Sequence, residues 1–285
     1  MNFAYTMQKF QDWFTQQWII IWGRKLNPKD INWLMGPFGE MEGIGENFIQ
    51  ELAQSEDLEI LRNCQSVGLL NSMDLLKLPQ EDLTRLSKGV IQFYENTSEY
   101  GFKFKVNWNL SFKIFGILIN KLFSQRINQL NIPSSQPADS QEISSELIQL
   151  IDKHSKEVNY TIWLRKLKSS GQIIYSGIYG ICEIPSGTIC IKAVFPLPKG
   201  NATIILKPKV GEKGELILQS IGKKFGDPGF YFLLSDSKNS IWSLYHSSFS
   251  DELMIHEKNQ KLYAIQTLRL WNFRVVTFQY EIENR

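Results

Sequence analysis

The sequence predicts an α+β fold, in which an N-terminal helical segment packs on a C-terminal, strongly curved antiparallel β-sheet or barrel of about ten strands. Large apolar residues recur at spacings of three and four before residue 131 and at a spacing of two after residue 144. The stretch NIPSSQPADSQEIS, at 131–144, lies between these halves and is rich in Pro, Ser and Gln. We therefore predict a mainly helical region at 1–132, a linker or surface loop at 133–143 and an antiparallel β domain at 144–285.

Four segments of the first half carry helix signals. Residues 6–22 place aromatic and aliphatic side chains on one face, and residues 45–53 form a shorter candidate. Residues 80–99 carry one apolar stripe just after Pro79, at a position where proline is tolerated. Residues 110–130 carry a wider apolar arc, which suits a helix docked between a sheet and other helices. We expect the last two segments to pack against the sheet.

The second half reads as a series of strands. Runs rich in β-branched and aromatic residues alternate with Gly, Pro, Asn and Asp at intervals of about ten residues. No helix-length amphipathic segment separates these runs, so an antiparallel meander is favoured over parallel crossovers. A curved or closed sheet protects the edges of so many strands. The predicted strands are 144–151, 158–167, 173–184, 188–195, 201–208, 215–221, 229–235, 240–246, 249–256, 262–270 and 274–283.

Composition excludes several classes of function. The chain has 285 residues, 43% of them hydrophobic, and a formal net charge of +2. This charge gives no argument for a nucleic-acid partner, so we expect none. The three cysteines form no CxxC pair and no zinc-like spacing with histidine, and their number is odd. We therefore expect no disulfide scaffold, no metal site and no cofactor.

The longest uninterrupted apolar run near the N-terminus is WIIIW at 18–22. This run is far shorter than the roughly 20 residues that a membrane-spanning helix needs. The N-terminus also lacks the basic region that begins a signal peptide. We therefore expect no signal peptide, no transmembrane segment and a cytoplasmic location. The sequence leaves the oligomeric state open.

The stretch GKKFGDPGFYF, at 222–232, resembles a phosphate-binding loop only in its glycines and lysines. The spacing from Gly222 to Gly226 does not fit GxxxxGK[ST], and a strand-like run rather than a helix follows. Asp227-Pro228-Gly229 is a turn signal. We predict a tight turn between two strands.

Cys182 and Cys190 flank the turn signal Pro185-Ser186-Gly187. A hairpin at this point would place the two cysteines nearly opposite each other on neighbouring strands. In a reducing compartment we expect two small buried thiols rather than a disulfide or a redox pair.

Aromatic residues are abundant in the β half, where they would either line an apolar ligand cavity or fill a packed core. Alternation does not distinguish these two, because both require apolar residues to point inward. An inward-pointing arginine would hold a carboxylate or phosphate by paired hydrogen bonds. The candidate ligand-binding residues are Trp163, Arg165, Tyr179, Phe230, Phe232, Trp242, Trp271 and Arg274.

The leading hypothesis is a non-enzymatic binder of a small apolar or amphipathic ligand in the β domain. No GxSxG motif and no activated nucleophile are present. An alternative is an enzyme acting on such a ligand through a histidine–carboxylate pair, with His246, His256 and Glu257 as candidates. A third possibility is a protein-interaction or membrane-surface module that uses the apolar segment 112–130 with its interspersed basic residues.

Overall fold

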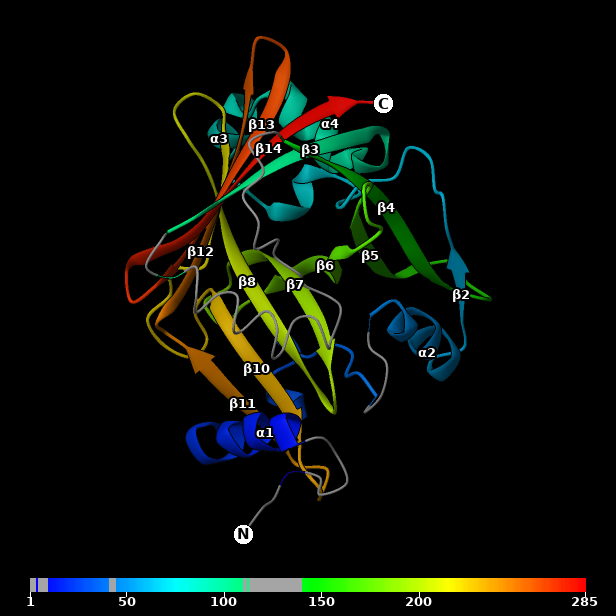
Figure 1. The fold of residues 1–285 in the computed structure, drawn as a ribbon, viewed down its shortest axis with the longest axis vertical. Helices are drawn as coiled ribbons and strands as arrows, with labels where there is room; N and C mark the ends of the chain where they lie inside the picture. Colours follow the sequence, from blue (N-terminus) through cyan, green and yellow to red (C-terminus); the bar gives the residue numbers. More distant parts are fainter. Residues whose placement is uncertain (1–3, 5–9, 41–44, 110–111, 113–139) are drawn as a thin grey trace.

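The computed structural model describes residues 4, 10–40, 45–109, 112 and 140–285. Its strands form one antiparallel sheet of 14 strands, which curves until β8 pairs with β9 (Figure 1). Ten of these strands make a closed barrel. Closure satisfies the backbone groups that an open sheet leaves at its edges. The predicted α+β architecture with an antiparallel barrel is therefore confirmed.

The barrel follows the order β8-β7-β6-β5-β4-β3-β14-β13-β12-β9 and returns to β8. Neighbouring strands are mostly hairpin-connected, as expected for a meander. Their bounds are β3 Tyr100–Trp108, β4 Gln141–Asp152, β5 Val158–Leu167, β6 Ile173–Glu183, β7 Ile189–Leu197, β8 Gly200–Val210, β9 Leu216–Gln219, β12 Phe249–Lys258, β13 Lys261–Leu270 and β14 Phe273–Asn284.

The sheet forks at β8. The first half of this strand pairs with β10 (Gly229–Ser235), whereas its second half, from Lys207, pairs with β9. From β10 the sheet continues to β11 (Ile241–His246) and β1 (Arg24–Leu26). A further short strand, β2 (Leu58–Leu61), pairs with the end of β4. The fork separates β10 from β9, so that β10 and β11 extend beyond one end of the barrel (Figure 1).

Helices cover the barrel at three places. The helix α1 (Phe10–Trp22) packs on β10 and β11, while α2 (Asn47–Ser55) covers the outer face of β4 and β5. At the opposite end from α1 lie the short helices α3 (Gln80–Arg85) and α4 (Lys88–Glu95) (Figure 1). Side chains of α4 belong to the main core together with inward residues of the barrel strands. The helix α4 therefore closes this end of the barrel.

All eleven predicted strands are present, with boundaries that differ by at most a few residues. The predicted helix at 80–99 is interrupted at Leu86, whose backbone is extended, because the hydroxyl of Ser87 caps a new helix by accepting a hydrogen bond from the amide of Val90 at 3.4 Å. Residues 97–99 form a 3-10 turn that leads into β3.

The predicted boundary between a helical and a β region needs a correction. Residues 100–108, inside the region expected to be mainly helical, form the barrel strand β3, and β4 begins at Gln141, inside the expected linker. The reason is a period of two in YGFKFKVNW, where apolar side chains alternate with lysines. The predicted helix at 110–130 lies outside the described residues except for Phe112, as does most of the predicted linker.

Candidate ligand site

The candidate site lies inside the barrel, on the inner face of β5. Successive residues of this strand point to opposite faces. Ile162 and Leu164 point outward and pack with side chains of α2, whereas Trp163 and Leu167 point inward into the main core. Arg165 lies between these two inward residues in the alternation. It is 8% exposed, so the barrel interior contains a buried guanidinium.

Aromatic rings surround this guanidinium. Its central carbon lies 4.3 Å from the ring centre of Trp163, 4.3 Å from that of Tyr175 and 5.7 Å from that of Tyr280. Tyr175 is directly opposite Arg165 on β6, and Ser145 is opposite it on β4. The Ser145 hydroxyl accepts a 2.9 Å hydrogen bond from the indole of Trp163, which fixes that ring beside the cation. Each such cation–π contact contributes about 0.5–2 kcal/mol.

No carboxylate among the described residues forms an ion pair with Arg165. Its Nε is buried and has no hydrogen-bond partner. An unpaired charge in a low-dielectric interior is costly, so buried arginines usually face an anion. The guanidinium is hydrogen-bonded to Tyr280, and its Nε–H stays available for a further hydrogen bond.

Four tyrosines lie in or against the same core. Burial raises the pKa of Tyr94, Tyr175, Tyr179 and Tyr280, so all four stay protonated at physiological pH. The positive charge of Arg165 opposes this rise for Tyr175, Tyr179 and Tyr280. The site therefore combines apolar ring faces with neutral hydroxyl groups that both donate and accept hydrogen bonds.

A second buried charged residue, Asp251, lies on β12 and is 2% exposed. Its two carboxylate oxygens accept hydrogen bonds of 3.0 and 2.8 Å from the side-chain amide of Gln266 on β13. Burial raises the pKa of Asp251 to about 7, with a smaller contribution from the charge of Glu252, while the Gln266 hydrogen bonds oppose the rise. This carboxyl group changes its charge near neutral pH inside the barrel.

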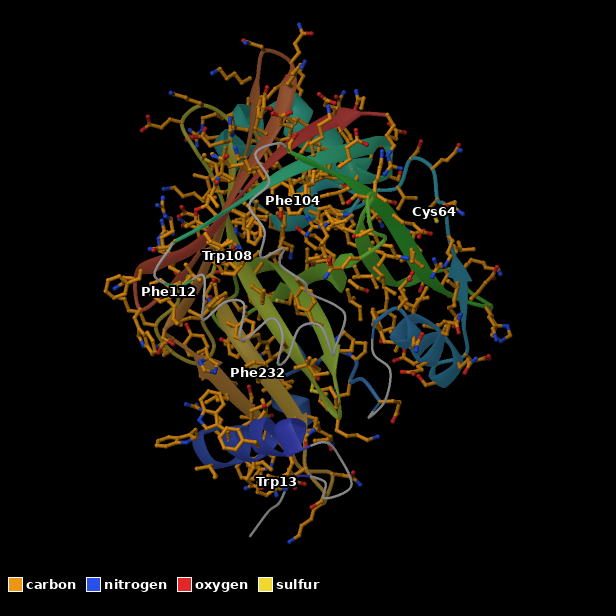
Figure 2. The ribbon with its side chains drawn as sticks, in the orientation of Figure 1. Trp13, Cys64, Phe104, Trp108, Phe112 and Phe232 are labelled. Atoms are coloured by element: carbon orange, nitrogen blue, oxygen red, sulfur yellow. The ribbon has the colours of Figure 1, made fainter. Side chains whose placement is uncertain are left out.

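A row of packed apolar side chains leads from Arg165 toward the end of the barrel that carries α1. Tyr175 packs against Phe195 with ring centres 5.1 Å apart. Phe195 forms a cluster with two small inward residues, Ala193 and Ala202, and with the half-buried rings of β10. These rings are Phe230 and Phe232, with centres 5.0 Å apart. In Figure 2, Phe104 lies toward the α4 end and Phe232 toward the α1 end.

Five of the eight predicted ligand-binding residues therefore lie on one continuous inner surface: Trp163, Arg165, Tyr179, Phe230 and Phe232. The other three lie elsewhere. Trp242 packs in the cluster beneath α1 and donates a 2.9 Å hydrogen bond to Asp236. Trp271 and Arg274 occupy the exposed hairpin between β13 and β14.

His246 and His256 are not brought together. His246 ends β11, where its ring lies 5.2 Å from Trp18 and 5.6 Å from Phe232. Burial lowers the pKa of His246, which favours the neutral imidazole. Among the described residues no carboxylate is hydrogen-bonded to it.

His256 and Glu257 are consecutive on β12, so their side chains point to opposite faces of the sheet. His256 stacks on Tyr263 at 5.7 Å, and its Nδ1 is buried without a partner. Glu257 accepts hydrogen bonds from the Ser87 hydroxyl at 2.7 Å and from the Gly89 amide at 3.1 Å. Glu257 thus holds the start of α4, and the geometry assembles no histidine–carboxylate pair from these two residues.

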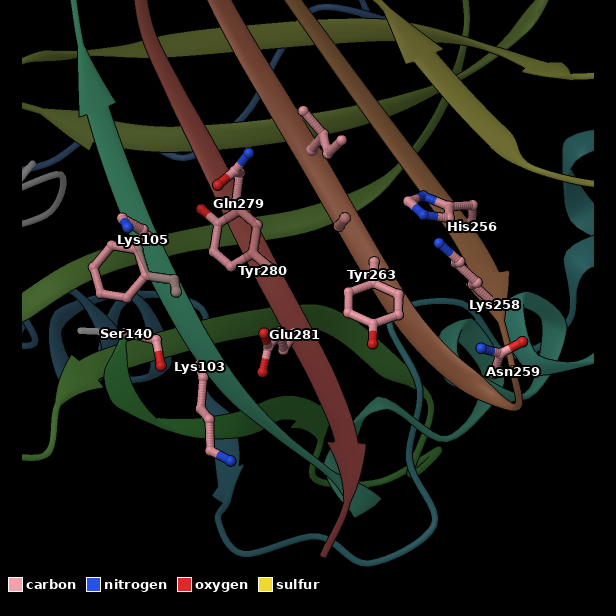
Figure 3. Close-up of a pocket in the computed structure, with 13 residues that line it drawn as sticks. Lys103, Lys105, Ser140, His256, Lys258, Asn259, Tyr263, Gln279, Tyr280 and Glu281 are labelled. Atoms are coloured by element: carbon pink, nitrogen blue, oxygen red, sulfur yellow. The ribbon is translucent and has the colours of Figure 1, made fainter. Parts of the chain in front are cut away.

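His256 also borders a depression of about 550 Å³ on the outer face of β3, β14, β13 and β12. Figure 3 shows lysines of β3, Gln279 and Glu281 of β14 and Tyr263 of β13 around it. Lys103, on its rim, pairs with Glu283 at 3.2 Å. The depression is open and its charges are mixed, so it offers less enclosure than the barrel interior.

Residues 220–228 connect β9 to β10 through a turn at Lys224–Asp227, so the connection is longer than the tight turn predicted, and residues 229–232 belong to β10. The Asp227 carboxylate accepts hydrogen bonds from the amides of Lys223 and Lys224 at 2.9 and 3.1 Å. These amides would otherwise be the donors to a phosphate, and β10 follows directly rather than a helix. Within the described residues, no group of three or more His, Cys, Asp or Glu side chains is placed to hold a metal ion.

No protein-family model matches this sequence, and no solved structure matches the chain. The chain is similar to the uncharacterised membrane protein YndJ of Bacillus subtilis, with 28% identity over 242 residues. The match covers 84% of this chain but 41% of YndJ, so the chain spans less than half the length of that curated relative. Among the described residues, no helix is both long and apolar enough to cross a bilayer.

Proposed function

We propose that this chain is a non-enzymatic binder of a small amphipathic molecule, which occupies the barrel interior around Arg165. Binding sites for such ligands are mostly apolar, with a few polar groups that fix the orientation of the ligand. The observation that carries the proposal is the buried guanidinium of Arg165, held by aromatic rings and left without a protein anion. The aromatic cluster that continues to Phe230 supplies the apolar part of the site.

Native mass spectrometry of the freshly purified protein tests this proposal. We expect an adduct of a few hundred daltons, which disappears when the protein is denatured and is recovered by solvent extraction. A clean mass of the bare chain, repeated with protein prepared from its own host and after incubation with long-chain amphiphiles, would contradict the proposal.

We further propose that the barrel sits at an anionic membrane surface through α1. The solvent-exposed face of this helix includes Ile21 and Trp22, which are 65% and 70% exposed. The exposed residues Arg24 and Lys25 follow directly. Exposed tryptophan beside basic residues suits the interface of an anionic bilayer. The similarity to YndJ, which is named a membrane protein, supports the same location. We propose a cytoplasmic location for the chain.

Sedimentation with anionic vesicles tests the membrane proposal. We expect the chain to pellet with these vesicles at low salt and to be released as salt rises. The double variant Ile21→Gln, Trp22→Gln should stay in the supernatant. Trp271→Gln, which removes another exposed tryptophan, is the matched control and should pellet like the unmodified chain. An unmodified chain that stays in the supernatant would refute this role.

A further inference from the structure

We infer that the ligand carries an oxyanion, a carboxylate or a phosphate, that binds Arg165 deep in the barrel, while its apolar tail extends toward Phe230 and Phe232. This inference rests on the proposed function, because it names the chemical class and the orientation of the ligand at the same site.

The charge balance of the interior favours an added anion. Arg165 and Asp251 are the buried charged residues of the barrel strands in the described part of the chain, and a third buried charged residue, Asp236, lies in the turn between β10 and β11. Both oxygens of Asp251 accept hydrogen bonds from Gln266, and no ion pair joins Asp251 to Arg165. Removing a guanidinium from water is costly, and the three ring contacts offset this cost only in part. An anionic group on the ligand would offset the rest of this cost.

The guanidinium has the geometry that an oxyanion needs. The central carbon of Arg165 lies over the rings of Trp163 and Tyr175, and the guanidinium is hydrogen-bonded to the Tyr280 hydroxyl. The Nε–H, on one edge of the planar group, has no acceptor. A carboxylate or phosphate can accept two parallel hydrogen bonds from such an edge. An alcohol or an amide offers a single neutral acceptor and leaves the charge uncompensated.

The inner wall sets the direction of the tail. At the α4 end, Tyr94 and Phe93 close the barrel above Tyr179 and Trp163. In the other direction the wall contains the small residues Gly177, Ala193 and Ala202. A Cβ atom on Gly177 would lie 2.8 Å from the Phe195 ring, so this ring packs directly over Gly177. An alkyl chain starting at Arg165 would extend along β7 and β8 toward the half-buried Phe230 by displacing the Phe195 ring.

A comparison of three ten-carbon ligands tests the inference. Decanoate, decyl phosphate and decanol share one tail and differ in the head group. We would measure their affinities by isothermal titration at about pH 6, where the carboxylate is ionised and Asp251 is mostly protonated. The proteins are the unmodified chain, Arg165→Met, and Arg269→Met as a control that removes an arginine from the half-exposed end of β13.

We expect the unmodified chain to bind at least one of the two anions at least about tenfold more tightly than decanol. The preferred anion identifies the head group. In Arg165→Met this preference should fall to about one, while decanol keeps its affinity within about threefold, which shows that the barrel is intact. Arg269→Met should behave like the unmodified chain.

Two results overturn the inference. Equal binding of decanol and both anions by the unmodified chain would leave a ligand-binding barrel but remove the anionic head group. A preference for the anion that persists in Arg165→Met would assign the head group to another residue. Failure of all three ligands to bind the unmodified chain is a different outcome, because it would also refute the proposed function for ligands of this length.

Discussion

The guanidinium carbon of Arg165 lies 4.3 Å from the ring centre of Tyr175, the residue directly opposite it on the neighbouring strand β6. Trp163 contacts the same guanidinium at the same distance from a position two residues earlier on β5. The two rings hold a buried cation in place without neutralising it. Sites that are prepared for a ligand often carry a cost in stability that the bound ligand relieves.

Removal of the charge should therefore not destabilise the ligand-free chain. Arg165→Met keeps most of the buried volume and eliminates an unpaired buried cation. We expect its midpoint of thermal unfolding to be unchanged or higher, with a gain of up to about 2 kcal/mol in the free energy of unfolding. Loss of more than about 2 kcal/mol, measured by denaturant unfolding of stripped protein, would instead show that Arg165 is a structural residue.

Asp251 should make stability depend on pH. Because burial raises the pKa of its folded-state carboxyl group to about 7, the native protein prefers the protonated form. The stabilisation that comes from the protonated Asp251 carboxyl group is fully present below the pKa of this group in the unfolded chain, about 4. It is lost as pH rises through about 7. Asp251→Asn should remove this dependence and stabilise the protein at pH 8 by at most about 4 kcal/mol, at about 1.4 kcal/mol per pKa unit.

Unfolding in urea at a series of pH values measures this effect. A constant difference between Asp251→Asn and the unmodified chain from pH 5 to pH 8 would show that the carboxyl group does not titrate in this range. Glu252→Gln serves as a comparison, because the charge of Glu252 also raises the pKa of Asp251, but to a smaller extent. The plot of unfolding free energy against pH for Glu252→Gln should resemble that of the unmodified chain, with its midpoint at a slightly lower pH.

Glu257 should matter for stability and His256 should not. Glu257 accepts hydrogen bonds from Ser87 and Gly89 and thereby anchors the first turn of α4. We expect Glu257→Ala to lower the free energy of unfolding by about 1–2 kcal/mol. His256→Ala and the exposed control Glu212→Ala should each change it by less than about 0.5 kcal/mol. Equal effects of all three substitutions in denaturant titrations would contradict this assignment.

The three cysteines should titrate as free thiols of unequal reactivity. Cys182 and Cys190 are opposite each other on β6 and β7, and both are buried and reduced. Burial raises the pKa of Cys182 to about 11 and that of Cys190 to about 12, so little thiolate exists at pH 8. With an aromatic disulfide reagent, we expect Cys64, which is half-buried, to react first and the pair only after unfolding. Fewer than three thiols in denatured protein prepared without reductant would contradict this prediction.

The strands of the β half were predictable because hairpins impose local signals. Each strand carries a run of β-branched and aromatic residues, and each turn carries residues such as Asp227-Pro228-Gly229. The strand at 100–108 carries the same signal, but it follows two helices and lies within the region predicted to be mainly helical. A curved sheet or barrel was predicted, but the strand pairs that close it, β8 with β9 and β3 with β14, could not be, because they join segments without a local signal.

The orientation of the Arg165 side chain could not be predicted from the sequence. Both faces of β5 are apolar, since Ile162 and Leu164 pack under α2 while Trp163 and Leu167 pack in the barrel. Alternation places Arg165 with Trp163 but does not say which face is the interior. The burial of Asp251 could not be predicted either, because its contact with Gln266 joins two strands through side chains.

A crystal structure of the protein with 10-bromodecanoate tests the central claim most directly, because anomalous scattering locates the bromine without reference to the protein. We expect the carboxylate within hydrogen-bonding distance of Arg165 Nε and the bromine among Phe195, Phe230 and Phe232. A bromine found in the depression beside His256, or a carboxylate at the surface with Arg165 still unpaired, would contradict the account.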